Sequence, residues 1–152
     1  MTHSSTGLQL GIFLLALVVF ATFWCLLTVL ISRLTGWAVL ARRFRSQSEP
    51  YGDARTVGPW LLTIYMRYWT HYSSIVKITA ANDALYLSIN MIGFRAGHPP
   101  LSIPWSEIAF SSQTWIFFRR YVVMILGKQE KIPLRISERT ARKLGILERV
   151  PK

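Results

Sequence analysis

The side chains that could carry out catalysis or bind a metal are few in this sequence and lie far apart. The three histidines, His3, His71 and His98, are isolated, and no cysteine or carboxylate stands near any of them at ligand spacing. Cys25 is the only cysteine and has no partner for an intrachain disulfide. No glycine-rich phosphate loop, nucleophile elbow or zinc-ligand helix is present. We therefore expect no catalytic residue, no metal and no cofactor, and a protein that is not an enzyme.

The basic side chains suggest a different chemistry, the binding of anions. The chain has 18 Lys and Arg against 7 Asp and Glu, a formal net charge of +11, and its first 32 residues carry none of these side chains. Guanidinium groups bind phosphate and carboxylate well. The residues that we expect to contact anionic lipid headgroups or an acidic partner surface are Arg33, Trp37, Arg42, Arg43 and Arg45.

An apolar run from Leu8 to Ile31 precedes these arginines. Its 24 residues would form a helix about 36 Å long, enough to cross a hydrocarbon core of about 30 Å. A helix that is apolar on every face belongs in a membrane or in a deep core, and the remaining residues are too few to bury this one. The sequence therefore predicts one transmembrane helix over residues 8–31.

The flanks of the run predict its orientation. Residues 1–7 form a short tail without Lys or Arg, the run is long, and no small-residue cleavage pattern follows it, so we expect an anchor rather than a cleavable secretory signal. Arginines on the C-terminal side alone place the N-terminus outside and the rest of the chain in the cytoplasm, by the positive-inside rule.

Residues 32–45 predict a basic amphipathic juxtamembrane helix, and residues 46–58, rich in Ser, Pro and Gly, predict a linker. The apolar residues that share one face of such a helix are Leu34, Trp37, Ala41 and Phe44. Two alternatives stay open. The helix could lie in the interface with Trp37 at headgroup level, or it could continue the span, with the arginines only setting the topology. Gly36 makes a bend between the two plausible.

From residue 59 to residue 152, short β-branched and aromatic runs alternate with turn signals, which predicts a small mainly β domain. The expected strands are Trp60–Tyr68, Ser74–Thr79, Ala84–Ile89, Met91–Arg95, Leu101–Ile103, Ile108–Ser111, Ile116–Leu126 and Lys131–Arg135. A C-terminal helix is expected between Ser137, a good N-cap, and Gly145, the expected stop.

Two segments of this domain, Ala84-Leu85-Tyr86-Leu87 and the stretch LSIPWSEI over residues 101–108, carry a resemblance. The region from about Ser74 to Leu147 resembles the pleckstrin-homology-like domains of bacterial membrane-anchored proteins. In those domains a Gly-Leu-Tyr-Leu strand precedes an Ile-Pro-Trp-x-x-Ile segment that turns the chain between two sheets; here Ala84 replaces the glycine. The resemblance implies a partly open barrel plugged by a helix, a bacterial inner membrane and usually no enzymatic activity. It does not imply phosphoinositide binding.

Residues 115–126 are apolar on both faces of the predicted strand, so one face needs cover from the C-terminal helix, another protein or the bilayer. The candidate protein-interface residues are Trp24, Trp115, Phe117, Phe118, Arg119, Arg120 and Tyr121. The aromatic and basic residues between Tyr65 and Tyr72 superficially resemble a platform for stacking nucleic-acid bases. Half of them would face the core of a strand-built domain, so nucleic acid is not an expected partner.

Two functions are compatible with these features. The first is a non-enzymatic accessory or scaffold subunit of a larger integral-membrane complex, such as a bacterial respiratory or photosynthetic one, held by its span and its cytoplasmic domain. The alternative is a stand-alone membrane-anchored module that binds anionic lipid headgroups. An uncovered apolar patch on the domain favours the first, and a basic pocket favours the second.

Overall fold

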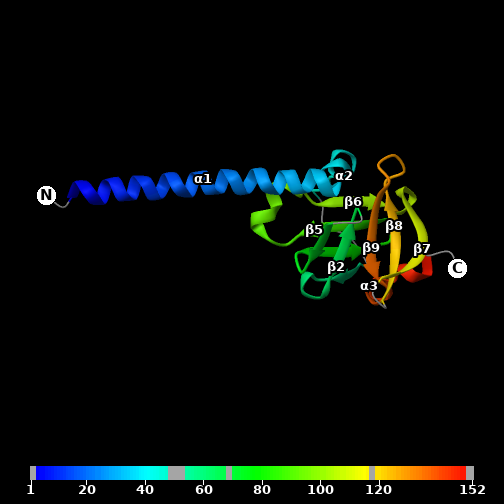
Figure 1. The fold of residues 1–152 in the computed structure, drawn as a ribbon. Helices are drawn as coiled ribbons and strands as arrows, with labels where there is room; N and C mark the ends of the chain where they lie inside the picture. The colour runs from blue at the N-terminus through cyan, green and yellow to red at the C-terminus, as the bar shows by residue number, and fades with distance from the viewer. Residues whose placement is uncertain (1–2, 48–53, 68–69, 117–118, 150–152) are drawn as a thin grey trace.

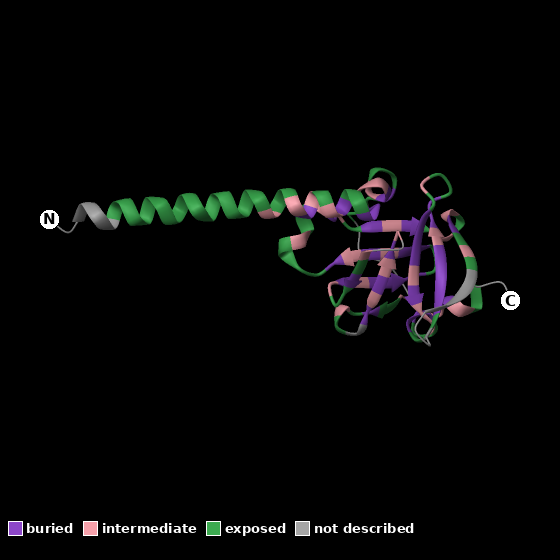
Figure 2. Cartoon of the chain, in the orientation of Figure 1, coloured by how far each residue is buried: buried purple, intermediate pink, exposed green. Residues whose placement is uncertain are grey.

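The chain begins with a 33-residue helix, α1 (His3–Thr35), that projects away from a mainly β domain (Figure 1). The computed structural model describes residues 3–47, 54–67, 70–116 and 119–149. In that part of the chain, α1 is the one helix long and apolar enough to cross a membrane, over Gly7–Thr35. Residues 7–23 are all exposed (Figure 2). The described domain therefore leaves this apolar surface free for lipid or for other spans.

The helical path breaks at Gly36, where the backbone turns into the left-handed region with φ of 88°. This positive φ requires glycine, while a Cβ atom here would meet only movable side-chain atoms, the nearest being Cδ1 of Ile132 at 2.8 Å. A second helix, α2 (Trp37–Phe44), follows directly. The alternative in which the span simply continues is therefore wrong, and the bend at Gly36 is confirmed.

The apolar face of α2 packs into the core of the β domain. Trp37 and Leu40 are fully buried, and Phe44 is nearly so. Leu34, which we expected on the same face, lies on α1 and is 64% exposed. The amphipathic stripe is thus real but covered by protein, and the prediction of an interfacial helix with Trp37 at headgroup level is wrong.

The described residues form nine strands in two antiparallel sheets, of four and five strands, that do not close into a barrel. The first sheet has the order β1 (Arg55–Val57), β4 (Val76–Ala80), β5 (Ala84–Ile89) and β6 (Leu101–Pro104). The second has the order β3 (Thr70–Ser73), β2 (Thr63–Met66), β9 (Ile132–Ser137), β8 (Arg119–Leu126) and β7 (Ile108–Ile116).

Short 3-10 helices connect the strands. They are η1 (Pro59–Leu61), η2 (Ile92–Gly97), η3 (Trp105–Glu107) and η4 (Ile146–Arg149). The segment from β6 through η3 to β7 carries the chain from the first sheet to the second, as the resemblance implies. Its Trp105 donates an indole hydrogen bond to the Ala81 carbonyl oxygen at 2.8 Å, which ties this corner to the β4–β5 turn.

Several predicted strand boundaries are wrong, each for a local reason. The expected strand Trp60–Tyr68 begins as η1, which Pro59 starts, and β2 ends at Met66, just before Arg67, whose φ is 47°. Ile116 pairs with Arg119, so the stretch predicted as one long strand is two antiparallel strands. The expected strand Met91–Arg95 is η2, and the predicted linker contains β1.

The C-terminal helix is confirmed as α3 (Glu138–Lys143). The Ser137 hydroxyl accepts a hydrogen bond from the Thr140 amide at 3.2 Å, which caps the first turn. Gly145 stops the helix with φ of 70°. Ala141 and Leu144 are buried in the core, so α3 supplies cover that the sheets need.

The packing of α2 gives the first testable prediction. Leu40→Ala should destabilise the domain by about 2–5 kcal/mol, because it removes a fully buried side chain. Leu34→Ala, six residues earlier and exposed, should change stability by less than about 0.5 kcal/mol. Chemical denaturation of the full chain in detergent micelles, followed by tryptophan fluorescence, measures both. A larger loss for Leu34→Ala would contradict the placement of α2.

Candidate functional site

The segment η2 lies along the C-terminal third of α1 and joins the helix to the domain. The Trp24 indole nitrogen donates a hydrogen bond to the Gly93 carbonyl oxygen at 2.9 Å, and the rings of Trp24 and Phe94 meet edge to face at 5.6 Å. At Gly97 the backbones touch, since a Cβ atom there would lie 2.7 Å from the Thr28 carbonyl oxygen. Any larger residue would push η2 off the helix.

The face of α1 that meets the domain is marked by small polar residues. Thr28, Ser32 and Thr35 are spaced four and three residues apart and are essentially inaccessible to solvent. Thr28 and Thr35 satisfy their hydroxyls on backbone carbonyls of α1. The Ser32 hydroxyl oxygen is buried and has no hydrogen-bond partner in the described structure. Its hydrogen-bonding capacity is therefore unused within the described structure.

A hollow of about 480 Å³, which we name the junction pocket, lies where α1, α2 and η2 meet. Ser32 and Arg33 line it from α1, Ala38 and Arg42 from α2, and Gly97 from η2. Both arginines are exposed, and no acidic side chain of the described residues pairs with either. The first turn of α2 contributes to the wall and has no side-chain cap. These features together suit an anion.

A second hollow, of about 460 Å³, lies where β1, β4 and the C-terminal helices meet. Arg55 and Arg149 line it, but so does Glu148. The Arg149 guanidinium already stacks over the Trp105 ring at 4.5 Å. This hollow therefore carries mixed charge, in contrast to the junction pocket.

Next to the junction pocket, a buried polar cluster connects α1 to the domain. The Tyr72 hydroxyl donates to Thr35 Oγ1 at 2.8 Å and lies 2.9 Å from Nε2 of His98. Nδ1 of His98 lies 3.0 Å from the Phe94 carbonyl oxygen, and the Trp37 indole donates to the Pro99 carbonyl oxygen at 2.9 Å. Side chains from α1, α2, β3 and the η2–β6 loop thus share one hydrogen-bonded layer.

Burial shifts both titratable groups of this cluster. It raises the pKa of Tyr72 from 10.0 to about 12, and the hydrogen bond with Thr35 acts weakly in the opposite direction. Burial lowers the pKa of His98 below 6.5, because the charged ring loses its hydration, while the hydrogen bond with the Phe94 carbonyl opposes the shift. The cluster is therefore built for a neutral phenol and a neutral imidazole.

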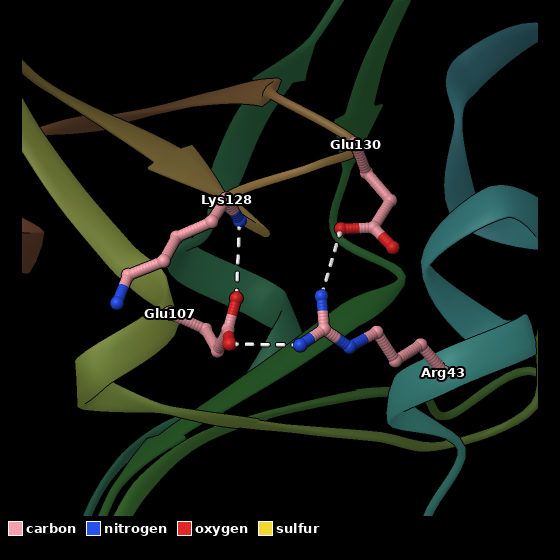
Figure 3. A network of polar contacts seen from close by, with 4 residues as sticks. All are labelled: Arg43, Glu107, Lys128 and Glu130. Carbon is pink, nitrogen blue, oxygen red and sulfur yellow. Dashed lines mark hydrogen bonds and ion pairs between the residues drawn. The ribbon is translucent and has the colours of Figure 1, made fainter.

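Arg43 ties α2 to η3 and to the turn between β8 and β9 (Figure 3). Its guanidinium lies 2.9 Å from Oε1 of Glu107 and 3.9 Å from Oε2 of Glu130. Oε2 of Glu107 accepts the Lys128 backbone amide at 3.1 Å, in the turn between β8 and β9. Both carboxylates are largely buried and the arginine is half-exposed, so Arg43 neutralises internal acids and is not free for a lipid headgroup.

The remaining predicted anion-contact residues are placed differently from one another. Trp37 is fully buried, so it cannot contact lipid, and its assignment as a headgroup contact is corrected. Arg33 and Arg42 come together at the junction pocket. Arg45 is exposed and forms an isolated backbone bridge with Leu101.

The predicted protein-interface residues have different surroundings in the structure. Trp24 packs on η2 of its own chain, and Tyr121 is buried with its ring 5.7 Å from that of Tyr65. Arg120 is exposed. Phe117 and Phe118 lie outside the described residues. For Trp115 and Arg119 the structure describes the backbone alone, in β7 and β8.

The buried cluster around Tyr72 and His98 and the burial of the Ser32 hydroxyl were not predicted from the sequence. His98 looked like an isolated loop residue, because Tyr72, its partner, stands 26 residues away. The recurrence of Thr28, Ser32 and Thr35 on one face of an otherwise apolar helix was the available signal.

Comparisons with known proteins do not assign a family. No protein-family model, no curated protein and no solved structure matches this chain.

The His98 cluster predicts a pH dependence of stability. Because the folded-state pKa lies below 6.5, the unfolded chain takes up the proton first as pH falls. The contribution of neutral His98 is therefore complete above about pH 6.5 and is lost as pH falls below it toward the folded-state value. Unfolding free energies of the full chain in micelles at pH 8 and pH 5.5 measure the loss.

His98→Gln should reduce this pH-dependent loss. The matched control is His71→Gln, at an exposed position on β3, which should leave the difference between the two pH values intact. An unchanged difference in the His98→Gln variant would contradict the assignment.

Proposed function

We propose that this chain is a single-pass protein of a bacterial inner membrane whose non-enzymatic cytoplasmic domain binds an anionic lipid headgroup in the junction pocket. The observation that carries the proposal is the pocket itself. Two arginines without acidic partners in the described chain and one unpartnered buried hydroxyl meet at the end of the apolar helix. That is the level at which a spanning helix meets lipid phosphates.

The proposed topology rests on the charges and on the contacts of α1. Arg33, Arg42 and Arg45 follow the apolar run, and no Lys or Arg precedes it, so the positive-inside rule favours a cytoplasmic domain. By length and composition alone, α1 could also be a secretory signal. The packing of Trp24, Thr28 and Ser32 against the domain supports a retained anchor, since removal of the helix would uncover that surface.

The ligand chemistry follows from the geometry of the donors. Guanidinium groups bind phosphate through charge-assisted hydrogen bonds, which contribute more than neutral ones. Ala38 and Gly97 leave room because their side chains are small or absent. A phosphate at the lipid surface would therefore meet two positive charges at once, with the buried Ser32 hydroxyl beneath them.

We also propose that the domain belongs to the pleckstrin-homology-like class. Support comes from the two antiparallel sheets, the segment over residues 104–108 that crosses between them, and the C-terminal helix packed on the core. The headgroup contact suggested here lies between the domain and its own span, so it does not depend on the ligand site of any related domain.

A second candidate function is an accessory subunit of a larger integral-membrane complex. The observation that favours it is Trp60, which is 86% exposed on η1 beside a hollow that Val57 and Lys143 help to line. Exposed tryptophans of this kind often anchor protein interfaces. The exposed apolar surface of α1 would then pack on other spans.

The test is native mass spectrometry of the full chain in a neutral detergent, titrated with phosphatidylglycerol or phosphatidylcholine. We expect phosphatidylglycerol to bind in preference, and Arg42→Gln to weaken its binding about tenfold, the loss expected for one charged hydrogen bond. Arg45→Gln is the matched control, an exposed arginine outside the pocket lining, and should change binding little.

Equal losses for Arg42→Gln and Arg45→Gln would contradict the pocket and indicate diffuse attraction to charge. A lack of preference between the two lipids would contradict the lipid function altogether. A stoichiometric protein partner retained through purification by a C-terminal tag would favour the accessory subunit.

A further inference from the structure

We infer that η2 enters the membrane beside α1 and that Met91 and Ile92 contact lipid acyl chains. This inference rests on the proposed span. Figure 1 shows the η2 segment, in light green, as the part of the domain that reaches furthest along α1 toward its N-terminal end. The connection between β5 and β6 is thus a second point of membrane contact.

The depth of η2 follows from its contacts with α1. Trp24 stands nine residues before Arg33, which is about 13 Å along an α-helix. Arg33 is the first charged residue after the span and marks the headgroup level. Gly93 is hydrogen-bonded to the Trp24 ring, so it lies at the depth of Trp24. A headgroup layer is about 5–7 Å thick on each side, so η2 passes through it to the acyl-chain boundary.

The side chains at the tip of η2 match that environment. Ile92 is 83% exposed and Met91 is 49% exposed, next to Gly93, which is hydrogen-bonded to α1. Phe94 turns the other way and packs on Trp24. Arg95 is exposed, and its Nε donates a hydrogen bond to the Ile89 carbonyl oxygen at 3.4 Å, at the end of β5.

Several polar backbone groups of η2 have hydrogen-bond partners within the protein, as a medium without water requires. The Gly93 carbonyl oxygen accepts from Trp24, and the Phe94 carbonyl oxygen lies 3.0 Å from Nδ1 of His98. The Phe94 amide donates to Met91 at 3.1 Å, and the His98 amide donates to Arg95 at 3.2 Å. Irregular backbone at membrane depth requires such partners, because an unpaired polar group there costs several kcal/mol.

The occupant is therefore lipid rather than a soluble partner. A loop held against α1 at the level of its apolar run cannot reach the aqueous phase unless α1 itself lies outside the membrane. Two consecutive exposed apolar residues at the tip are what an interfacial insertion requires. The domain would then be fixed to the membrane at two points, the span and η2.

The test uses single-cysteine variants of the full chain in a Cys25→Ser background, each labelled with an environment-sensitive fluorophore in lipid vesicles. The test position is Ile92→Cys, where the side chain is mostly exposed and the label replaces little internal packing. Leu17→Cys, exposed in the apolar run, is the lipid reference, and Gln129→Cys, exposed in the β8–β9 turn, is the aqueous reference.

Lipids spin-labelled near the acyl-chain boundary should quench the Ile92 label several-fold more than the Gln129 label, and aqueous iodide should show the reverse order. Lipids spin-labelled deep in the acyl chain should quench the Leu17 label, which lies near the middle of the proposed span. Quenching at Ile92 equal to that at Gln129, with Leu17 quenched by lipid, would overturn the inference and leave the span intact. An Ile92 label shielded from both quenchers would also overturn it, in favour of a protein cover. If lipid fails to quench Leu17, the proposed span and this inference both fall.

Discussion

The backbone contact between Gly97 and α1 is the constraint on which the rest of this structure depends. Only a glycine lets η2 lie against Thr28 and Val29. That approach brings His98 to Tyr72 and Thr35, and it closes one wall of the junction pocket. Gly36 has the complementary role at the other end, since its left-handed conformation turns the chain so that α2 enters the domain core.

The consequence is that the apolar helix and the β domain form one unit rather than an anchor and a tethered domain. Three polar layers hold them together: Trp24 on Gly93, the Tyr72–His98 cluster, and the ion pairs of Arg43. The hydrogen bonds of the Tyr72–His98 cluster are buried, and a bond broken there costs more than one broken at the more exposed contacts of Trp24 and Arg43. A domain attached in this way has a fixed height and orientation relative to the membrane that we propose α1 crosses.

Sequence reasoning succeeded where the signals are local. Composition alone identifies a helix that could span a membrane, and Ser137 and Gly145 delimit α3 because capping chemistry acts within a few residues. The sequence predictions failed where tertiary contacts decide the structure. The stripe of α2 has the same pattern whether lipid or protein covers it. The apolar residues around η2 resembled a strand, but Phe94 packs on Trp24 of α1 and Ile92 is exposed. The buried hydrogen bonds of His98 could not be predicted, because Tyr72 is distant from it in the chain.

The most direct test of this account is a distance measurement across the junction by pulsed electron resonance. Spin labels at Leu17 and Gln129, introduced as cysteines in a Cys25→Ser background, report the position of the domain relative to α1 in lipid nanodiscs. A rigid junction gives one narrow distance distribution, and Gly97→Val, which forces η2 off the helix, broadens it. A broad distribution in the protein that retains Gly97 would mean that the domain swings freely, and would contradict the account.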